Sequence, residues 1–392
     1  MSSYHYLIIG GGMTADAAVR GIREIDTDGT IGVVSAEADP PYNRPPLTKA
    51  LWKGDPLDSI WRRTGEASVD LHLGRRVTTL NLPNKTAIDD RDDAFTFDKL
   101  LLATGASPRR LPFGGDSVVY YRTLEDYRRV RAIADKGGSV LVIGGGFIGS
   151  EIAAALAMNG CKVTMVFPED GIGARVFPAD LARYLVKYYR EKGVDVHPAE
   201  EVVGIKASDG GTVISTKSGG SLQADAVIAG IGVTPNVDLA KAAGLAVEDG
   251  IIVDEHLATS LHDVFAAGDV ARFTSPALGK RMRVEHEDNA LTMGRAAGRA
   301  MAGDKAPYTH LPFFYSDLFD LGYEAVGDMD PRLETVADWK TPFREGVIYY
   351  LAGKRVRGVL LWGIFGKVNE ARTLISDAAE VDAARLKGRI TA

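Results

Sequence analysis

Cysteine is nearly absent from this sequence of 392 residues. Its single cysteine, Cys161, means that no disulfide can form within the chain and that there is no Cys-x-x-Cys motif. So little cysteine is typical of a protein from a reducing compartment. Because Cys161 comes directly before an expected strand at 162–167, we predict a buried thiol that contributes only to packing.

Long apolar runs and an excess of basic charge are missing as well. No apolar run reaches the ~18 residues of a membrane helix. The first residues, MSSYHYLIIGGG, lack the basic segment and the cleavage site of a signal peptide. The net charge of −6 argues against nucleic acid as the main partner. We therefore expect a cytoplasmic protein without a membrane span, a nucleic-acid partner or a metal site.

A glycine loop follows the first apolar run of the sequence. The run at 6–9 leads into GGGMTA at 10–15, and a helical pattern continues to about residue 25. Gly10 permits a tight turn, Gly12 lets the backbone approach a pyrophosphate, and Ala15 lets the helix lie against the strand. Glu37 lies 22 residues past the loop, where an acid can bond a ribose hydroxyl. A plain strand–turn–helix is the alternative.

The same pattern returns after a second apolar run at 140–143. The loop residues expected to bind a dinucleotide are Gly144, Gly146, Phe147, Ile148 and Gly149. A helix is expected from about Ser150 to Asn159, and Glu169 lies 20 residues past the loop. Two such loops predict two dinucleotides, and hydride transfer between a nicotinamide and a flavin uses two. Glu169 should repel a 2′-phosphate and favour NADH over NADPH, although the nearby Arg175 could offset this preference.

Two further apolar strands end in residues suited to a flavin. One, at 100–112, contains Ala103, Thr104 and Gly105, and the other, at 264–270, ends in Gly268 and Asp269. Gly268 allows a close approach of the backbone, and Asp269 can accept a hydrogen bond from a ribityl hydroxyl. Each segment by itself is compatible with an ordinary strand end.

Several stretches resemble a known family. They are PYNRPPLTKALW, IGGGFIGSEIAAAL, VFAAGDV, RVEHEDNALTMGRAAG, FFYSDLFDLGYEAVGD and EGVIYYLAGKRVRGVLLWGIF. From about residue 6 to about residue 375 the chain resembles the two-dinucleotide flavoprotein reductases with the glutathione reductase-type fold. Within them it is similar to the ferredoxin and rubredoxin reductases and to the apoptosis-inducing-factor branch.

The resemblance implies an α/β fold with two Rossmann-like domains, one for FAD and one for NADH, and an α+β C-terminal domain. The FAD-binding domain is split between 1–113 and 234–305, and the NADH-binding domain is inserted at 114–233. A C-terminal domain of the interface type fills 306–392. Gly232, in the stretch AGIGVTP at the return crossing, is expected to contact NAD.

Lys49 follows a loop stiffened by four prolines in the stretch PPYNRPPLTK. The resemblance implies that this lysine lies beside flavin N5 and pairs with Glu151. Phe147 and Glu151 are four residues apart, so they lie on one face of the expected helix. A buried lysine needs a carboxylate partner, because an unpaired interior charge is costly. There are two structural alternatives: a salt bridge between domains, or an ordinary turn before a helix that starts near Leu47.

The resemblance assigns the remaining residues of the site. Phe147 is expected at the nicotinamide entrance and Tyr315 as a stacking wall, with core aromatics as the alternatives. Glu285 and His286 precede a helix whose positive end favours a reduced, anionic flavin. His286 is expected to stack near the flavin or to be a structural histidine. Arg44 is expected to bond the pyrophosphate or flavin carbonyls, or to staple its own loop.

The function implied is hydride transfer from NADH to flavin N5, followed by electron transfer to an acceptor without a redox cysteine. The acceptor is a ferredoxin or rubredoxin, a quinone or oxygen, and these alternatives stay open. A basic rim would suit an acidic iron–sulfur partner; it comprises Arg272, Lys280, Arg281 and Arg283. The alternative function is redox sensing, in which NADH forms a charge-transfer complex with the reduced flavin and promotes a homodimer.

Overall fold

The computed structural model describes residues 2–208, 210–377 and 379–391. The chain divides into two compact units. Unit 1 comprises Met1–Arg44, Leu57–Ser107 and Thr234–Pro312, and unit 2 comprises Pro45–Pro56, Pro108–Val233 and Phe313–Ala392. In the described ranges, each helix is too short or too polar to cross a lipid bilayer.

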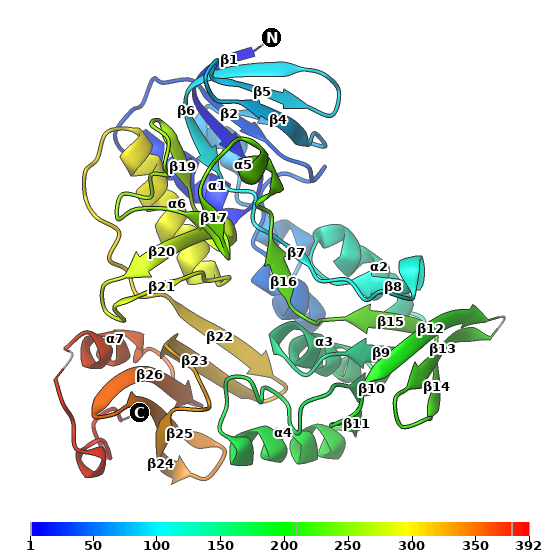
Figure 1. Ribbon diagram of the computed structural model, residues 1–392. Coiled ribbons are helices and arrows are strands. Elements are labelled where there is room, and N and C mark those ends of the chain that lie inside the picture. The colour runs from blue at the N-terminus through cyan, green and yellow to red at the C-terminus, as the bar shows by residue number, and fades with distance from the viewer. Residues whose placement is uncertain (1, 209, 378, 392) are drawn as a thin grey trace. The chain divides into compact units, whose positions relative to one another are not determined.

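Unit 1 is built on a seven-stranded sheet (Figure 1). Its strands are β1 (Ser2–Ile9), β2 (Ile31–Val34), β3 (Asp70–His72), β4 (Val77–Asn81), β5 (Thr86–Asp89), β6 (Ala94–Leu102) and β19 (Val264–Ala266). The order is β3-β2-β1-β6-β5-β4, and β19 pairs with β6. Parallel pairing joins β1, β2, β3, β6 and β19, while β4 and β5 are antiparallel. The last four residues of β1 are all buried, which explains their unbroken apolar run.

Two long helices of unit 1 pack backbone to backbone. They are α1 (Met13–Arg23) and α6 (Glu287–Met301), which lie side by side in Figure 1. A Cβ on Gly298 would lie 2.0 Å from the carbonyl oxygen of Ala18, and one on Gly21 would lie 2.2 Å from that of Arg295. Only glycine fits at such distances. The close packing of α1 and α6 therefore depends on a glycine in each helix, although the two helices lie far apart in the sequence.

Smaller elements complete unit 1. A four-stranded sheet has the order β17-β18-β20-β21. Its strands are β17 (Val247–Glu248), β18 (Gly250–Ile252), β20 (Ala271–Ser275) and β21 (Lys280–Met282), and the short helices are α5 (Asp238–Ala242), η3 (Leu57–Ile60), η4 (Thr64–Ala67) and η6 (Gly268–Val270). The strands β7 (Ala106–Pro108) and β16 (Val233–Pro235) form a two-stranded sheet where the chain leaves and re-enters unit 1.

Unit 2 contains a five-stranded parallel sheet of order β11-β10-β9-β15-β8. Its strands are β8 (Val118–Tyr120), β9 (Ser139–Ile143), β10 (Lys162–Val166), β11 (Asp195–His197) and β15 (Ala226–Ala229). The helices are η5 (Gly115–Ser117), α2 (Leu124–Ala134), α3 (Phe147–Met158) and α4 (Ala179–Glu191), and a three-stranded sheet comprises β12 (Val202–Ser208), β13 (Gly211–Thr216) and β14 (Ser221–Ala224). Thr123 and Asp126 form a capping box that starts α2.

The last part of unit 2 is a five-stranded antiparallel sheet of order β22-β23-β26-β25-β24. Its strands are β22 (Phe313–Leu318), β23 (Leu321–Gly327), β24 (Glu334–Thr341), β25 (Glu345–Ala352) and β26 (Arg355–Trp362), and the helices that follow are α7 (Val368–Ser376) and η7 (Ala383–Arg385). α7 packs on β23 and β26. The rings of Tyr323 on β23 and Trp362 on β26 stack in the core of this part of unit 2, with centroids 5.4 Å apart.

Candidate functional site

The first glycine loop lies between β1 and α1 in unit 1. Gly10 has a φ of 121°, and a Cβ there would lie 2.1 Å from the carbonyl oxygen of Ala103, so only glycine fits. Gly12 is the N-cap of α1 and has no side-chain cap. A Cβ on Gly12 would meet nothing nearer than an Arg44 nitrogen at 4.0 Å. The loop thus presents uncapped N–H groups to open space, which fits a pyrophosphate.

Glu37 and Arg44 form one cluster with Tyr42. The Tyr42 hydroxyl donates to Oε2 of Glu37 over 2.6 Å and accepts from Nη1 of Arg44 over 3.0 Å. Arg44 also forms an ion pair with Glu37. These contacts of Arg44 agree with the alternative in which the arginine holds its own loop in place. Tyr42 was not among the predicted site residues, and its position two residues before Arg44 is the signal that could have indicated it.

Other residues predicted for the flavin gather at one edge of the unit 1 sheet. Ile9 and Ala266 both align with Leu102 in parallel register, so the residues that follow these three strands meet at the carboxyl edge. The segments at this edge are Gly10–Gly12, Ala103–Gly105 and Gly268–Asp269. Ala15 is fully buried in α1, as the small residue of the loop should be.

The backbone around this edge is held by specific hydrogen bonds. The side chain and carbonyl of Thr104 exchange two 2.8 Å bonds with Asn236. Gly268 has a φ of 78°, and a Cβ there would lie 2.3 Å from the Thr14 hydroxyl. Next to Gly268, the carbonyl of Asp269 accepts from Nη1 of Arg283 over 3.1 Å. These contacts join the segments at this edge to the rest of unit 1.

Glu285 and His286 precede α6, which begins at Glu287. Glu285 accepts from Nη1 of Arg283 over 2.5 Å. His286 is the N-cap residue of α6, and burial lowers the pKa of its ring to about 4. The ring is therefore neutral at neutral pH, which suits stacking better than charge stabilisation.

The second glycine loop lies between β9 and α3 in unit 2. Gly144 has a φ of 114°, and a Cβ on it would lie 2.4 Å from the carbonyl oxygen of Gly230. Gly146 is the N-cap of α3 without a side-chain cap, and a Cβ on it would meet nothing within 4 Å. A Cβ on Gly149 would lie 2.0 Å from the carbonyl oxygen of Gly144. This loop therefore has the same uncapped, open construction as the first.

The helix after this loop starts earlier than expected. We predicted a start near Ser150, whereas α3 begins at Phe147, because Gly146 takes the N-cap position. Phe147 and Ile148 therefore lie in the first turn. Past the loop, Glu169 forms an ion pair with Arg175 over 2.6 Å. Gly232, with a φ of 96°, accepts a hydrogen bond from the Arg109 amide over 2.9 Å.

Lys49 lies between two short 3-10 turns, η1 (Pro45–Thr48) and η2 (Ala50–Lys53), and not at the start of an α-helix. The Lys49 amide donates to the carbonyl of Pro46 over 3.1 Å, and its carbonyl accepts from the Trp52 amide over 3.0 Å. The carbonyl of Leu47 accepts from the Trp52 indole over 2.7 Å and from the Tyr121 hydroxyl. These bonds hold the backbone of the proline-rich loop on both sides of the lysine.

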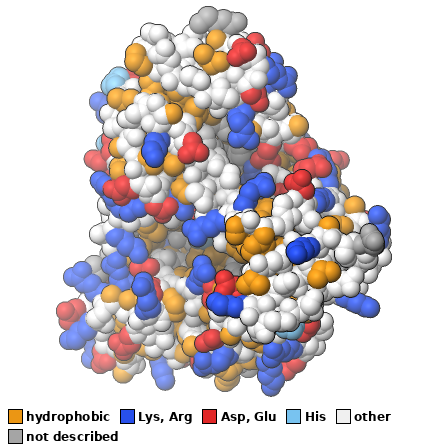
Figure 2. Space-filling view, turned by 45° about the vertical axis from the view of Figure 1, so that its right-hand side comes forward, with side chains coloured by type: hydrophobic (Ala, Val, Ile, Leu, Met, Phe, Trp, Pro, Cys, Tyr) orange, Lys and Arg blue, Asp and Glu red, His pale blue; other side chains and the backbone are white. Residues whose placement is uncertain are grey.

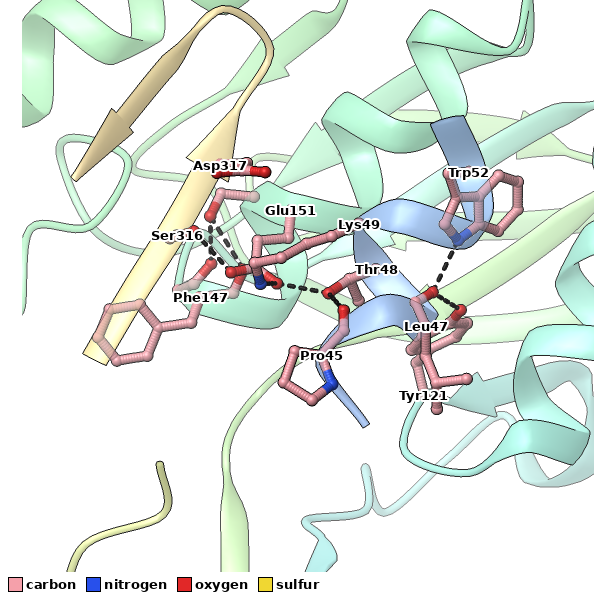
Figure 3. Close-up of polar contacts among 12 residues, drawn as sticks. Pro45, Leu47, Thr48, Lys49, Trp52, Tyr121, Phe147, Glu151, Ser316 and Asp317 are labelled. Atoms are coloured by element: carbon pink, nitrogen blue, oxygen red, sulfur yellow. Dashed lines mark hydrogen bonds and ion pairs between the residues drawn. The ribbon is translucent and has the colours of Figure 1, made fainter. Parts of the chain in front are cut away.

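The ammonium of Lys49 pairs with Glu151 in unit 2 (Figure 3). Nζ lies 2.7 Å from Oε2, and the two side chains are only 11% and 5% exposed. The Thr48 hydroxyl donates to the same Oε2 over 2.5 Å, and the Ser316 hydroxyl donates to Oε1 over 2.6 Å. One carboxylate thus accepts from three side chains that come from two other segments of the chain.

Aromatic side chains surround this ion pair. The rings of Phe147 and Phe314 meet edge to face at 5.1 Å. Nζ of Lys49 lies 5.3 Å from the centroid of the Tyr315 ring, and Tyr315 is 36% exposed, so it is not a core tyrosine. Burial, and after it the Glu151 carboxylate, raise the pKa values of Tyr189 and Tyr323 well above the usual range. Both phenols therefore stay neutral.

Comparison with known proteins places this chain. Residues 4–294 match the model of "Pyridine nucleotide-disulphide oxidoreductase", and residues 297–342 and 337–377 match that of "Apoptosis-inducing factor, mitochondrion-associated, C-term". The chain belongs to the pyridine nucleotide-disulphide oxidoreductase family. It is therefore an FAD-dependent NAD(P)H oxidoreductase, and the predicted fold class is confirmed.

Individual relatives cover nearly the whole chain. Apoptosis-inducing factor 1, mitochondrial, of Dictyostelium discoideum is 33% identical over 96% of this chain and 79% of its own length. Putidaredoxin reductase CamA of Pseudomonas putida is 32% identical over 96% and 92%. The reductase in the covalent putidaredoxin reductase–putidaredoxin complex superposes with a TM-score of 0.91 at 31% identity, covering 98% and 96%.

The family name refers to a disulphide that this chain cannot form. Cys161 is buried after α3, as predicted, and burial raises the pKa of its thiol. A thiol of raised pKa is a poor nucleophile at neutral pH. Electrons that reach the flavin therefore do not leave through a dithiol of this chain.

Proposed function

We propose that this chain oxidises NADH and passes the electrons to a ferredoxin- or rubredoxin-type iron–sulfur protein. Bound FAD supplies the chemistry, because it takes a hydride at N5 and releases electrons one at a time. The observation that carries the proposal is the buried Lys49–Glu151 pair in a chain that has two open glycine loops and no second cysteine.

We assign one glycine loop to each nucleotide. The loop of unit 1 would hold FAD, and the residues assigned to it are Gly10, Gly12, Ala15, Glu37, Arg44, Ala103, Thr104, Gly105, Gly268, Asp269, Glu285, His286, Lys49 and Tyr315. The loop of unit 2 would hold NADH, and its residues are Gly144, Gly146, Phe147, Ile148, Gly149, Glu151, Glu169 and Gly232. In support, both loops leave the N–H groups of a helix start uncapped.

The same assignment gives a domain plan. We propose an FAD-binding domain at 1–113 and 234–305, an NADH-binding domain at 114–233 and a C-terminal domain at 306–392. Three sheets support this plan: the seven-stranded sheet uses strands from the first two ranges only, the parallel sheet of β8 to β15 lies within the third, and the antiparallel sheet of β22 to β26 lies within the last.

Lys49 would supply a fixed positive charge for the flavin, which becomes more negative when it is reduced. Glu151 holds the lysine and balances its charge in a buried place. Phe147 would serve the nicotinamide, and its ring packs edge to face against Phe314. We assign no acid–base role to His286, because its ring has little tendency to take up a proton above pH 4.

Glu169 would select NADH. Its carboxylate follows β10, where it would bond the adenosine ribose and repel a 2′-phosphate. Its partner Arg175 is 75% exposed, so the arginine can turn away at little cost. While Arg175 is paired with Glu169, it is not available to a 2′-phosphate, so the ion pair supports a preference for NADH.

The iron–sulfur acceptor is supported by the relatives and less by the charge of the predicted basic rim. Arg272 pairs with Glu248 over 3.3 Å, and Arg283 pairs with Asp249 over 3.2 Å. Lys280 and Arg281 lie next to each other on β21. Acidic and basic side chains are interspersed on the face drawn in Figure 2. The partner of a putidaredoxin reductase is the better guide to the acceptor.

An anaerobic titration with NADH tests the proposal. The visible absorbance of the flavin should bleach with one equivalent, and added oxidised ferredoxin should restore it within seconds. Restoration by a quinone or oxygen but not by ferredoxin would replace the acceptor. An absence of bleaching would refute NADH-dependent flavin reduction altogether.

The second candidate is redox sensing, which the match at 297–377 to the apoptosis-inducing-factor model supports. In that case a long-wavelength band would form with NADH and persist in air. Sedimentation of the same samples should then show a dimer with NADH and a monomer without it. Rapid turnover with ferredoxin and an unchanged sedimentation coefficient would exclude this candidate.

A further inference from the structure

Two hydroxyl groups hold the carboxylate of Glu151, and neither belongs to the ion pair. Thr48, on η1, donates to Oε2, and Ser316, on β22, donates to Oε1 (Figure 3). Both side chains are buried, at 7% and 1% exposure, so water cannot replace them without a rearrangement. Ser316 lies 165 residues from Glu151, so its contact is a product of the fold.

We propose that Thr48 and Ser316 are positioning residues for Lys49, which act by fixing both oxygens of Glu151. The inference rests on the proposed function, in which Lys49 serves the flavin. It adds two residues to that site that neither motif spacing nor family resemblance suggested.

The reasoning concerns the last torsion of the glutamate. Rotation about χ3 of a glutamate is broad and nearly two-fold, so an ion pair alone leaves the two oxygens interchangeable. A separate hydroxyl on each oxygen makes them inequivalent: Oε1 faces β22, while Oε2 faces Thr48 and Lys49. The plane of the carboxylate is then fixed, and the long lysine side chain has one place for its ammonium.

Ser316 is itself held by a rigid part of unit 2. Ser316 on β22 is aligned with Tyr323 on β23 in the antiparallel register, and the Tyr323 ring stacks on Trp362. Tyr323 and Trp362 are both under 2% exposed. The strand that carries the Ser316 hydroxyl is therefore fixed by the sheet, as a positioning role requires.

The test removes each hydroxyl at nearly constant shape, in Thr48→Val, in Ser316→Ala and in both together. Thr48→Ser is the rescue, because it keeps the donor. Thr64→Val is the matched control: Thr64 donates over 2.7 Å to the buried carboxylate of Asp16, which has no link to Lys49. All variants are studied as the FAD-loaded protein.

The first readout is the ¹⁵N ammonium signal of Lys49, assigned by its loss in Lys49→Met. A held ammonium exchanges its protons slowly with water. We expect exchange to become about tenfold faster for each hydroxyl removed, since one hydrogen bond to a charged group corresponds to roughly that factor. Thr48→Ser and Thr64→Val should exchange like the wild type. The second readout, the rate of flavin reduction by NADH, should fall in parallel while NAD⁺ affinity stays the same.

Unchanged exchange of the Lys49 ammonium in both single variants and in the double variant would overturn the inference. Faster exchange with an unchanged reduction rate would support the positioning of Lys49 and refute its role toward the flavin, so the two failures are distinguishable. If Ser316→Ala does not fold, Thr48→Val decides by itself, because valine fills the volume of threonine.

Discussion

Lys49→Met tests whether the buried ion pair matters to the fold as well as to the reaction. Methionine keeps most of the apolar stem and removes the charge. Removing one partner of a buried pair typically costs about 3–5 kcal/mol, because the other charge is left without compensation. Here the hydroxyls of Thr48 and Ser316 still donate to Glu151 over 2.5 and 2.6 Å. Hydrogen bonds to a charged group contribute about 1.5–3 kcal/mol each, so they partly compensate the charge of Glu151. We therefore expect Lys49→Met to lower the free energy of unfolding by about 2–3 kcal/mol, which is less than the typical cost.

Urea titration followed by circular dichroism measures this loss, and flavin fluorescence reports release of FAD in the same samples. Glu151→Gln and the double variant complete a double-mutant cycle, in which a coupling above about 1 kcal/mol is expected for groups in contact. Lys53→Met is the matched control from the same loop. Its ion pair with Asp317 is as short, at 2.8 Å, but both side chains are over a third exposed. It should unfold near the wild-type midpoint.

The kinetic arm uses the same variant. With FAD retained, reduction by NADH should slow about 100-fold, the usual effect of losing one preorganised charge at a reacting centre. A reduction rate within twofold of the wild type would reject the role of Lys49 toward the flavin. Zero coupling in the cycle would reject the ion pair as a contribution to stability.

Four further outcomes are expected. Glu169→Ala should reduce the ratio of kcat/KM for NADH over NADPH, because Arg175 is then free to meet a 2′-phosphate; an unchanged ratio would show that Glu169 does not read the ribose. Since the pKa of His286 falls from 6.5 to about 4 on folding, the unfolded chain binds the extra proton between these values. The contribution of His286 to stability is then fully present above about pH 6.5 and is lost as the pH falls toward 4. In His286→Asn, the urea midpoint should therefore change less with pH over this range. Gly12→Ala should lower the FAD content of the purified protein without changing the apoprotein midpoint, because its Cβ would meet nothing nearer than an Arg44 nitrogen at 4.0 Å. Gly298→Ala should destabilise the apoprotein, since its Cβ would lie 2.0 Å from a carbonyl oxygen.

The parts of the site that depend on short-range pattern could be predicted from the sequence. Both glycine loops, the strands before them and the helices after them follow from spacing, because a turn, a helix start and a strand end are local events. Glu37 and Glu169 were predicted as ribose-binding residues from their distance to the two loops in the sequence. The α1–α6 contact was not predictable in this way, since no pattern in one helix names the other.

The surroundings of Glu151 show where spacing fails. Its pairing with Lys49 came from resemblance, and its hydroxyl partners Thr48 and Ser316 were not predicted. A serine in a strand is usually an ordinary polar residue, and nothing in the letters around Ser316 indicates a carboxylate 165 positions away. Such contacts are fixed by how sheets and helices of unit 2 come together. The cluster of Tyr42, Arg44 and Glu37 was missed because a loop gives no periodicity to read.

The contact between α1 and α6 has a consequence for the order in which the nascent chain can fold. The glycine face of α1 has no partner until residue 301 has left the ribosome, and β6 lacks its neighbour β19 until residue 266 has done so. The parallel sheet of unit 2 uses only residues 118–229, so its strands are all available earlier. Chains usually fold their N-terminal domain first during synthesis. Here α1 must wait for α6, which begins 287 − 23 = 264 residues after α1 ends, and β6 must wait for β19, which begins 264 − 102 = 162 residues after β6 ends.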